Sequence, residues 1–236
     1  MAEIESKDSH LRDILKDELY YQIPIYQHPY QWGKEQCEEL LNDLFENYED
    51  HGENDYFCGS LVFIQSDKDN KTDIVDGQQR LSTFILLAKV LATLYSERLA
   101  PKIQEYLQES WSDRHEDGEK KKRKRLDFDL VGSSAKKDFQ DALDFFDDLD
   151  ASKGEDSKSN APSKGKNSYL KNAICLKNYL EKKEIADIND FIRWLYFKVI
   201  FIRTTCSNIS MALRIFSVLN ARGLALSATD IFKGDC

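Results

Sequence analysis

The stretch TDIVDGQQRLSTFILLAKVLATL, residues 72 to 94, decides how the rest of the chain can be arranged. Its first part contains Ile74 and Val75, a short apolar run typical of a buried strand, and its second part is apolar on most sides, which predicts a buried helix. Five residues of another character separate the two: Asp76, Gly77, Gln78, Gln79 and Arg80. Polar groups at the mouth of a core element need partners, so this turn is a candidate site.

Two interpretations of the turn are open from these residues. The free amides at a helix start, with the positive end of the helix dipole and the guanidinium of Arg80 beside them, would form an anion site of the kind that holds phosphate. Alternatively, Asp76 caps the helix and Gln79 reaches back from the third helical position, as in a capping box.

Composition limits the classes of protein to which the chain can belong. Its 236 residues are 41% hydrophobic and 11% aromatic, enough for one large domain or two lobes with a sizeable core. No signal peptide and no apolar run of the ~20 residues that span a bilayer are visible, so we expect a soluble, cytoplasmic protein without membrane contact. The net charge is −9, from 33 basic and 42 acidic residues, which disfavours attraction of the whole molecule to nucleic acid. DNA contact would need a local basic patch or another domain.

The cysteines and histidines show no metal-ligand pattern. Five cysteines are scattered without a C-x-x-C pair, which argues against a disulfide framework and a zinc site. The four histidines, at 10, 28, 51 and 115, are equally scattered. No cysteine lies in the turn at 76 to 80, so redox chemistry there is disfavoured.

The segment YYQIPIYQHPYQW, residues 20 to 32, carries five aromatic residues interleaved with glutamines and His28. Two prolines make it extended, because each disfavours helix at the residue before it. The segment could pack across the fold as ordinary core. It could also form a pocket wall, where ring faces hold a planar group and a glutamine or histidine contacts its polar edge.

Hydrophobic spacing elsewhere predicts further helices and strands. The expected helices are 9–18, 37–48, 96–111, 138–149, 169–180, 191–195 and 209–219, and the expected strands are 56–65, 126–130 and 197–202. Gly59 inside the strand 56–65 suggests a bulge, or close approach of another backbone or a ligand. The polar stretch at 151–166 should be a mobile loop. The basic run KKKRKR at 120–125 is either a DNA-contacting patch, a localisation signal or a solvated face.

The last residues predict that the chain continues beyond its end. Ser227 starts another helix with Asp230 as its capping-box partner, and only nine residues follow Ser227. A helix that begins there should not stop at Cys236. We therefore expect this chain to be a fragment of a longer protein.

Four ordered blocks carry a resemblance to a known family. IPIYQHPYQW at 23 to 32, YFCGSLV at 56 to 62, D-G-Q-Q-R at 76 to 80 and IFSVLNARGLALSATDIFK at 215 to 233 resemble the motifs of the N-terminal domain of GmrSD-type, modification-dependent restriction enzymes. Where the family usually has an arginine after the first glutamine, this chain has His28, which puts ligand affinity or its pH dependence in question.

The resemblance implies an α+β fold similar to ParB and sulfiredoxin. We expect a small mixed sheet with a buried helix after the D-G-Q-Q-R turn in residues 1–100, and a mostly helical second lobe in residues 101–236. In family members the DNA-cutting part is usually a separate C-terminal HNH domain. That domain is missing here, and the histidines form no H-N-H arrangement, so we expect no nuclease activity from this chain.

The resemblance also implies binding of a nucleoside triphosphate with Mg²⁺, and its hydrolysis, coupled to restriction of modified phage DNA through the full-length protein. The base is not specified. In this hypothesis Gly77 lets the backbone approach the phosphates, the Gln78 and Gln79 amides donate to them and Arg80 neutralises charge. Asp76 would hold Mg²⁺ through water or orient the attacking water, and Gln78 or Gln79 could position that water. The remaining expected nucleotide-site residues are Gln27, His28, Tyr30 and Trp32 as pocket wall and Asn220 and Arg222 closing from the other lobe.

A second class of function stays open beside the nucleoside triphosphatase. The chain could be a non-catalytic module that binds modified DNA or a partner and keeps the D-G-Q-Q-R turn for structure alone. The density of polar side chains converging on the turn favours the nucleotide site.

Overall fold

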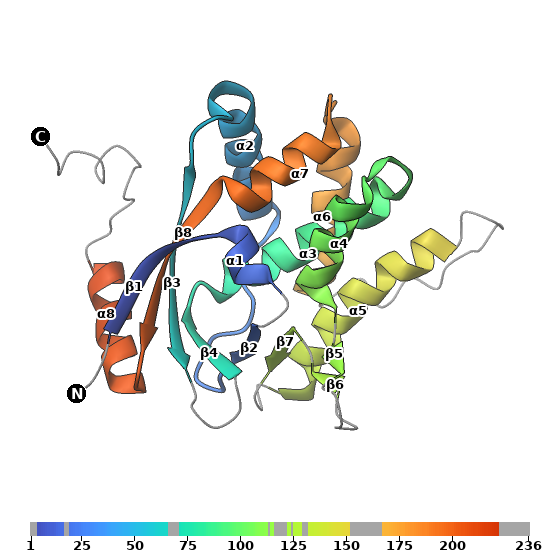
Figure 1. Cartoon of the computed structure of the whole chain (residues 1–236). Coiled ribbons are helices and arrows are strands. Elements are labelled where there is room, and N and C mark those ends of the chain that lie inside the picture. Colours follow the sequence, from blue (N-terminus) through green and yellow to red (C-terminus); the bar gives the residue numbers. More distant parts are fainter. Residues whose placement is uncertain are drawn as a thin grey trace, which may run out of the picture.

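The computed structural model describes residues 4–16, 19–65, 71–112, 114–115, 122–123, 125–128, 132–151 and 167–221. A mixed six-stranded sheet stands at its centre, with the strand order β1-β8-β3-β4-β2-β7 (Figure 1). The strands are β1 (Ile4–His10), β2 (Tyr20–Ile23), β3 (Tyr56–Gln65), β4 (Lys71–Asp76), β7 (Leu126–Phe128) and β8 (Val199–Cys206). β3 pairs antiparallel with β4 and parallel with β8, whereas β2 runs parallel to both of its neighbours. A separate two-stranded ribbon joins β5 (Arg114–His115) to β6 (Lys122–Arg123).

Helices cover both faces of the sheet and confirm the expected α+β class (Figure 1). They are α1 (Leu11–Leu15), α2 (Lys34–His51), α3 (Gln78–Leu94), the 3-10 turn η1 (Ser96–Arg98), α4 (Pro101–Trp111), α5 (Gly132–Ala151), α6 (Ser168–Lys182), α7 (Ile188–Phe197) and α8 (Ile209–Ala221). Of the described helices, α8 alone lies on one side of the sheet, where Ala212 packs with the sheet residues Val62, Val75 and Cys206. The other helices lie on the opposite side.

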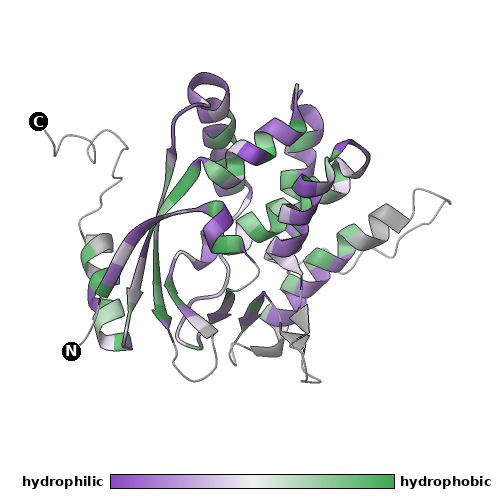
Figure 2. Cartoon of the chain, viewed as in Figure 1, coloured by the Kyte–Doolittle hydropathy of each residue, from purple (hydrophilic) through white to green (hydrophobic). Residues whose placement is uncertain are grey.

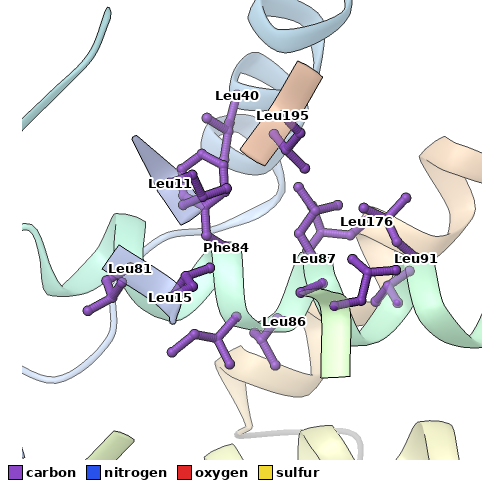
Figure 3. Packing of buried hydrophobic residues seen from close by; sticks show 14 of the residues in the cluster. Leu11, Leu15, Leu40, Leu81, Phe84, Leu86, Leu87, Leu91, Leu176 and Leu195 are labelled. Atoms are coloured by element: carbon purple, nitrogen blue, oxygen red, sulfur yellow. The ribbon is translucent and has the colours of Figure 1, made fainter. Parts of the chain in front are cut away.

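Helix α3 is the centre of the larger core, as its sequence predicts. Residues on all of its sides are buried, including Phe84, Leu86 and Leu87. Figure 3 shows leucines from α1, α2, α6 and α7 converging on it. A helix surrounded in this way has no solvent-facing stripe, and each of its large apolar side chains contributes about 1.5–3 kcal/mol by leaving water.

Strand β8 joins the two parts of the chain that the sequence separated at about residue 100. It lies between β1 and β3, so the sheet and its core contain residues from both parts. The expected strands 56–65 and 197–202 and the helices expected at 37–48, 138–149, 169–180, 191–195 and 209–219 are confirmed, most of them a few residues longer.

The helix expected at 9–18 is wrong for its first part. Residues 4–10 form β1, which pairs antiparallel with β8 along its whole length, and only Leu11–Leu15 is helical. β1 is a polar edge strand, largely purple in Figure 2, and its backbone hydrogen bonds to β8 replace those that a helix would have made. Leu11, Ile14 and Leu15 have helical spacing and are buried.

The described residues of the basic run at 120–125 have different structural roles. Lys122 and Arg123 form β6, whereas Arg125 is 1% exposed and its guanidinium donates to the carbonyls of Lys16, Leu19 and Glu109. Arg125 is therefore structural and not part of a DNA-contacting patch. Within the described ranges no helix is both long and apolar enough to cross a membrane. Residues 152–166 of the expected loop and the helix expected from Ser227 lie outside the described residues.

Candidate functional site

The D-G-Q-Q-R turn joins the end of β4 to the start of α3. Gly77 is the N-cap of α3 and has a φ of 91°, in the left-handed region that favours glycine. A Cβ at this position would lie 2.2 Å from Leu61 Cδ2 and 3.3 Å from the Ser60 carbonyl oxygen of β3. The turn therefore requires glycine for two reasons, its dihedral angle and the close approach of β3.

In the part of the chain that the structure describes, no side chain caps the first turn of α3. Asp76 Oδ1 accepts a hydrogen bond from the Gly77 amide at 2.8 Å and does not reach further into the helix. The capping-box interpretation is wrong because Gly77, which has no side chain, occupies the cap position, and Gln79 points elsewhere. The first amides of a 17-residue helix are thus left as donors at the positive end of its dipole.

Both glutamine side chains of the motif bind the loop that connects β2 to α2, residues 24–33, called here the β2–α2 loop. Gln78 Nε2 donates to the His28 carbonyl oxygen at 2.7 Å and to Gln27 Oε1 at 3.2 Å. Gln79 Oε1 accepts from the amides of Gln31 at 2.8 Å and Trp32 at 3.2 Å. These bonds fix the orientation of each side-chain amide. They leave Gln78 Oε1 without a hydrogen-bond partner among the described residues.

Two further contacts tie the same loop to the core. Gln27 Nε2 donates to the Val75 carbonyl oxygen at 2.6 Å, beside the turn. The Tyr30 hydroxyl lies 2.7 Å from Thr83 Oγ1 of α3, and the Tyr30 ring stacks on Tyr169 of α6 with centroids 4.3 Å apart. Tyr30 is 7% exposed, and burial raises the pKa of its phenol. This residue follows the packing interpretation of the aromatic segment.

Trp32 lies differently, because it lines a cavity. Its carbonyl oxygen accepts from Asn172 Nδ2 of α6 at 2.7 Å, while its amide donates to Gln79. The half-buried Trp32 forms one wall of a cavity of about 730 Å³ between α2 and α6. None of the residues 76 to 80 lines this cavity, and Gln31 and Trp32, which do, donate their amides to Gln79 of the turn.

Arg80 extends from the first turn of α3 over Gly59 of β3. A Cβ at Gly59 would lie 2.5 Å from Arg80 Nη1, and Gly59 has a φ of 120° where the register of β3 with β8 shifts. The bulge expected at Gly59 is confirmed, and the group that approaches it is a side chain. Within the described ranges the half-buried guanidinium of Arg80 has no hydrogen bond or ion pair. A phosphate would supply the missing acceptor.

Asp76 is the carboxylate of the turn. Burial raises its pKa above the ordinary value, and the Gly77 amide and the Arg80 guanidinium oppose that rise. Its Oδ2 and the free Gln78 Oε1 provide two oxygen atoms. Mg²⁺ is typically held by one or two carboxylates together with water and substrate phosphates, so this donor set fits it. Among the described residues, no three histidine, cysteine or acidic side chains are grouped so that they could hold a metal ion.

The neighbouring cysteine does not suit redox chemistry. Cys58 lies on β3 near Arg80, and burial raises the pKa of its thiol to about 12. The thiol is therefore protonated at neutral pH, whereas a reactive cysteine needs a thiolate.

The remaining expected site residues are placed only in part. The backbone of His28 contributes its carbonyl oxygen to Gln78, and its side chain is exposed. Asn220 is in the last turn of α8, on the opposite side of the sheet from α3, and its side chain is not among the described atoms. Arg222 lies outside the described residues.

Comparison with known protein families shows to which family this chain belongs. The family described as "GmrSD restriction endonuclease, N-terminal domain" matches residues 11–235. The chain belongs to this family. It is therefore a restriction-system domain, as the resemblance of its four sequence blocks implied, and its role lies in phage defence. No curated protein matches the chain.

Proposed function

We propose that this GmrSD-type domain binds a nucleoside triphosphate with Mg²⁺ at the D-G-Q-Q-R turn and hydrolyses it. The domain would thereby regulate restriction of modified DNA by the full-length protein. The observation that carries the proposal is the first turn of α3, which has no side-chain cap among the described residues, with the guanidinium of Arg80 beside it, which has no hydrogen bond or ion pair to them. Both features leave hydrogen-bond donors without acceptors at one place, and a phosphate chain supplies acceptors.

Each residue of the turn has its own role in the proposed site. Gly77 lets the phosphates approach the backbone, and the site tolerates no side chain there, because a Cβ would also collide with Leu61 of β3. The main-chain amides of Gln78 and Gln79 donate to the phosphate oxygens. Arg80 neutralises charge that develops as the terminal phosphate leaves, the role that arginine has in other phosphoryl-transfer sites.

Asp76 and Gln78 are the residues that would act on water. When bound with the nucleotide, Mg²⁺ neutralises phosphate charge. Asp76 accepts a proton from water or holds a water of the metal shell through its free Oδ2. Gln78 Oε1 accepts from the attacking water, since its Nε2 is already bound to the β2–α2 loop. Gln79 Oε1 already accepts hydrogen bonds from two loop amides, so we assign Gln79 a positioning role.

The β2–α2 loop forms the outer wall of the proposed site. Gln27 and Tyr30 hold the loop, and the exposed side chain of His28 and the half-buried Trp32 are the loop groups placed to meet a ligand. We assign closure of the site from the other lobe to Asn220 and Arg222, as the family resemblance implies.

The test is isothermal titration with slowly hydrolysed analogues of GTP, ATP, CTP and UTP in Mg²⁺. The wild-type chain, Arg80→Ala and Arg193→Ala are titrated in parallel. Arg193 is an exposed arginine of α7 whose partner is Asp190, which makes it a matched loss of one charge. We expect at least one analogue to bind the wild type and Arg193→Ala, and binding to Arg80→Ala to fall at least 100-fold, with a thermal melt close to that of the wild type.

The second candidate function, a binding module with a structural turn, has its own support. Both glutamine side chains are used to hold the β2–α2 loop, which a purely structural motif would also do. The titration separates the two functions. If no analogue binds the wild type, or if Arg80→Ala mainly lowers the melting temperature, the structural role is favoured.

A further inference from the structure

The cavity beside Trp32 is a groove that the proposed nucleotide site does not use. It is formed by the first turns of α2 and by one face of α6, and its volume is about 730 Å³. The α2–α6 groove is lined by Gln31, Trp32, Gly33, Lys34, Glu38, Ser168, Lys171, Asn172, Ile174, Cys175, Asn178, Tyr179, Lys182 and Lys183. The β2–α2 loop separates it from the D-G-Q-Q-R turn.

The groove is basic although the chain is acidic. Its lining carries Lys34, Lys171, Lys182 and Lys183 against the single carboxylate of Glu38. Lys34 pairs with Glu38 at 3.5 Å, and Lys183 pairs with Glu49, which lies outside the lining, at 2.8 Å. The lining itself thus contains four lysines and one carboxylate, on a chain with a net charge of −9. Such exposed pairs contribute only about 0–1 kcal/mol each, so a polyanion can displace them.

The length of the groove distinguishes an extended ligand from a single phosphate. Lining residues recur along one face of α6 from Ser168 to Lys182, a distance of about 21 Å at the helical rise. Each strand of B-DNA presents a phosphate about every 3.4 Å of the helix axis, so the groove is long enough for several phosphates and not for one alone. Lys171 and Lys182 are exposed and lie about 16 Å apart. Asn178 lies between them on α6, and Gln31 and Ser168 add further neutral hydrogen-bonding groups to the lining.

We propose that the α2–α6 groove binds the sugar-phosphate backbone of the DNA on which the restriction system acts. The inference rests on the proposed role in DNA restriction but does not require nucleotide binding. Lysines along the helix contact successive phosphates, and the half-buried rings of Trp32 and Tyr179 provide apolar faces for sugars or an unstacked base. The local positive charge is the basic patch that an acidic protein needs for DNA contact.

The contacts of Trp32 connect this groove to the turn. On the groove side, Asn172 Nδ2 holds the Trp32 carbonyl oxygen at 2.7 Å, and on the turn side Gln79 Oε1 holds its amide at 3.2 Å. DNA that moves Trp32 therefore changes the hydrogen bonds of a motif glutamine. This route would carry information about bound DNA to the nucleotide site.

Fluorescence anisotropy with a labelled 20-base-pair duplex tests the groove. An unmodified duplex suffices, because phosphate contacts do not depend on the bases. The variant Lys171→Glu/Lys182→Glu is compared with Lys102→Glu/Lys137→Glu, which changes charge equally at exposed lysines of α4 and α5. We expect the groove variant to bind at least about tenfold more weakly. The slope of log K against log salt should become shallower by about two, whereas the control stays close to the wild type.

Several outcomes would decide against the groove. Equal weakening of both double variants would show a general charge effect, and no salt-dependent binding by the wild type would show that this chain has no DNA surface. The nucleotide titration is repeated on the groove variant, where it should be unchanged. Loss of nucleotide binding with DNA binding retained would assign the groove to the nucleotide. Conversely, DNA binding that persists in a chain with no nucleotide affinity would leave the groove intact and remove only the proposed hydrolysis.

Discussion

The D-G-Q-Q-R turn and the α2–α6 groove lie on opposite sides of one loop, and their polar side chains differ in exposure. In the turn, the side chains of Gln78 and Gln79 make most of their hydrogen bonds to atoms of the β2–α2 loop. In the groove, Lys171 and Lys182 are exposed. Substitution of Gly77 or of the turn glutamines should therefore change structure and ligand binding together, whereas substitution of the exposed groove lysines should change binding alone. This difference can be tested with pairs of matched variants.

The largest contrast is expected between two glycines. Gly77→Ala forces a left-handed residue and places a Cβ 2.2 Å from Leu61, so we expect a loss of about 2–4 kcal/mol of unfolding free energy. Gly33→Ala, in the groove lining, meets only Gln36 Oε1 at 3.5 Å and has a φ of −116°, so the loss should be within about 0.5 kcal/mol. Urea denaturation measures both. Similar losses for the two variants would remove the contrast between turn and groove.

Two asparagines of α6 provide the next contrast. Asn172 is 2% exposed and donates to the Trp32 carbonyl oxygen and the Tyr30 hydroxyl, so Asn172→Ala should lose about 2 kcal/mol. Asn178 is exposed in the same groove, and Asn178→Ala should leave stability nearly unchanged. If thermal melts showed no effect of Asn172→Ala, the attachment of the β2–α2 loop to α6 would be unimportant, and the proposed link to the turn would lose its support.

The smallest expected effect depends on pH and comes from Asp76. Burial raises the pKa of this carboxyl in the folded protein, so its ionised form is disfavoured by folding. The folded state then binds the proton more tightly than the unfolded state, and stability falls as pH rises through the folded-state pKa. Asp76→Asn should therefore melt at a higher temperature than the wild type at pH 7. The advantage should vanish below 3.8, the ordinary pKa of aspartate. A lower melting temperature for Asp76→Asn at pH 7 would contradict this expectation.

Elements with local hydrophobic periodicity could be predicted from the sequence, and elements that depend on distant partners could not. The apolar run of β3 and the all-round apolar surface of α3 are visible in a window of 20 residues. β1 is polar and becomes a strand only because β8, almost 200 residues later, offers its backbone. Local pattern therefore favoured helix at Ser9, where the structure has strand.

The candidate site was predictable in its location but not in its bonding. Gly59 and Gly77 signalled close approaches, and the structure shows that Arg80 and Leu61 are the approaching groups. The acceptors of Gln78 and the donors to Gln79 are main-chain atoms of the β2–α2 loop, which carry no sequence signal. The groove gave a partial signal in the spacing of 171, 175, 178 and 182 on one helical face. That Lys34 of α2 forms the opposite wall of the groove could be seen only in the folded structure.

The insertion of β8 between β1 and β3 also has a consequence for biosynthesis. On the ribosome, β3 emerges roughly 130 residues before β8, which at 5–20 residues per second is a delay of about 7–26 s. Until then β3 has one unpaired edge, and β1 has no partner at all in the sheet. Unpaired edges beside apolar side chains invite aggregation, so the nascent chain needs protection through most of its translation. Truncated chains that end before Val199 should be insoluble or degraded, even though they contain the complete D-G-Q-Q-R turn.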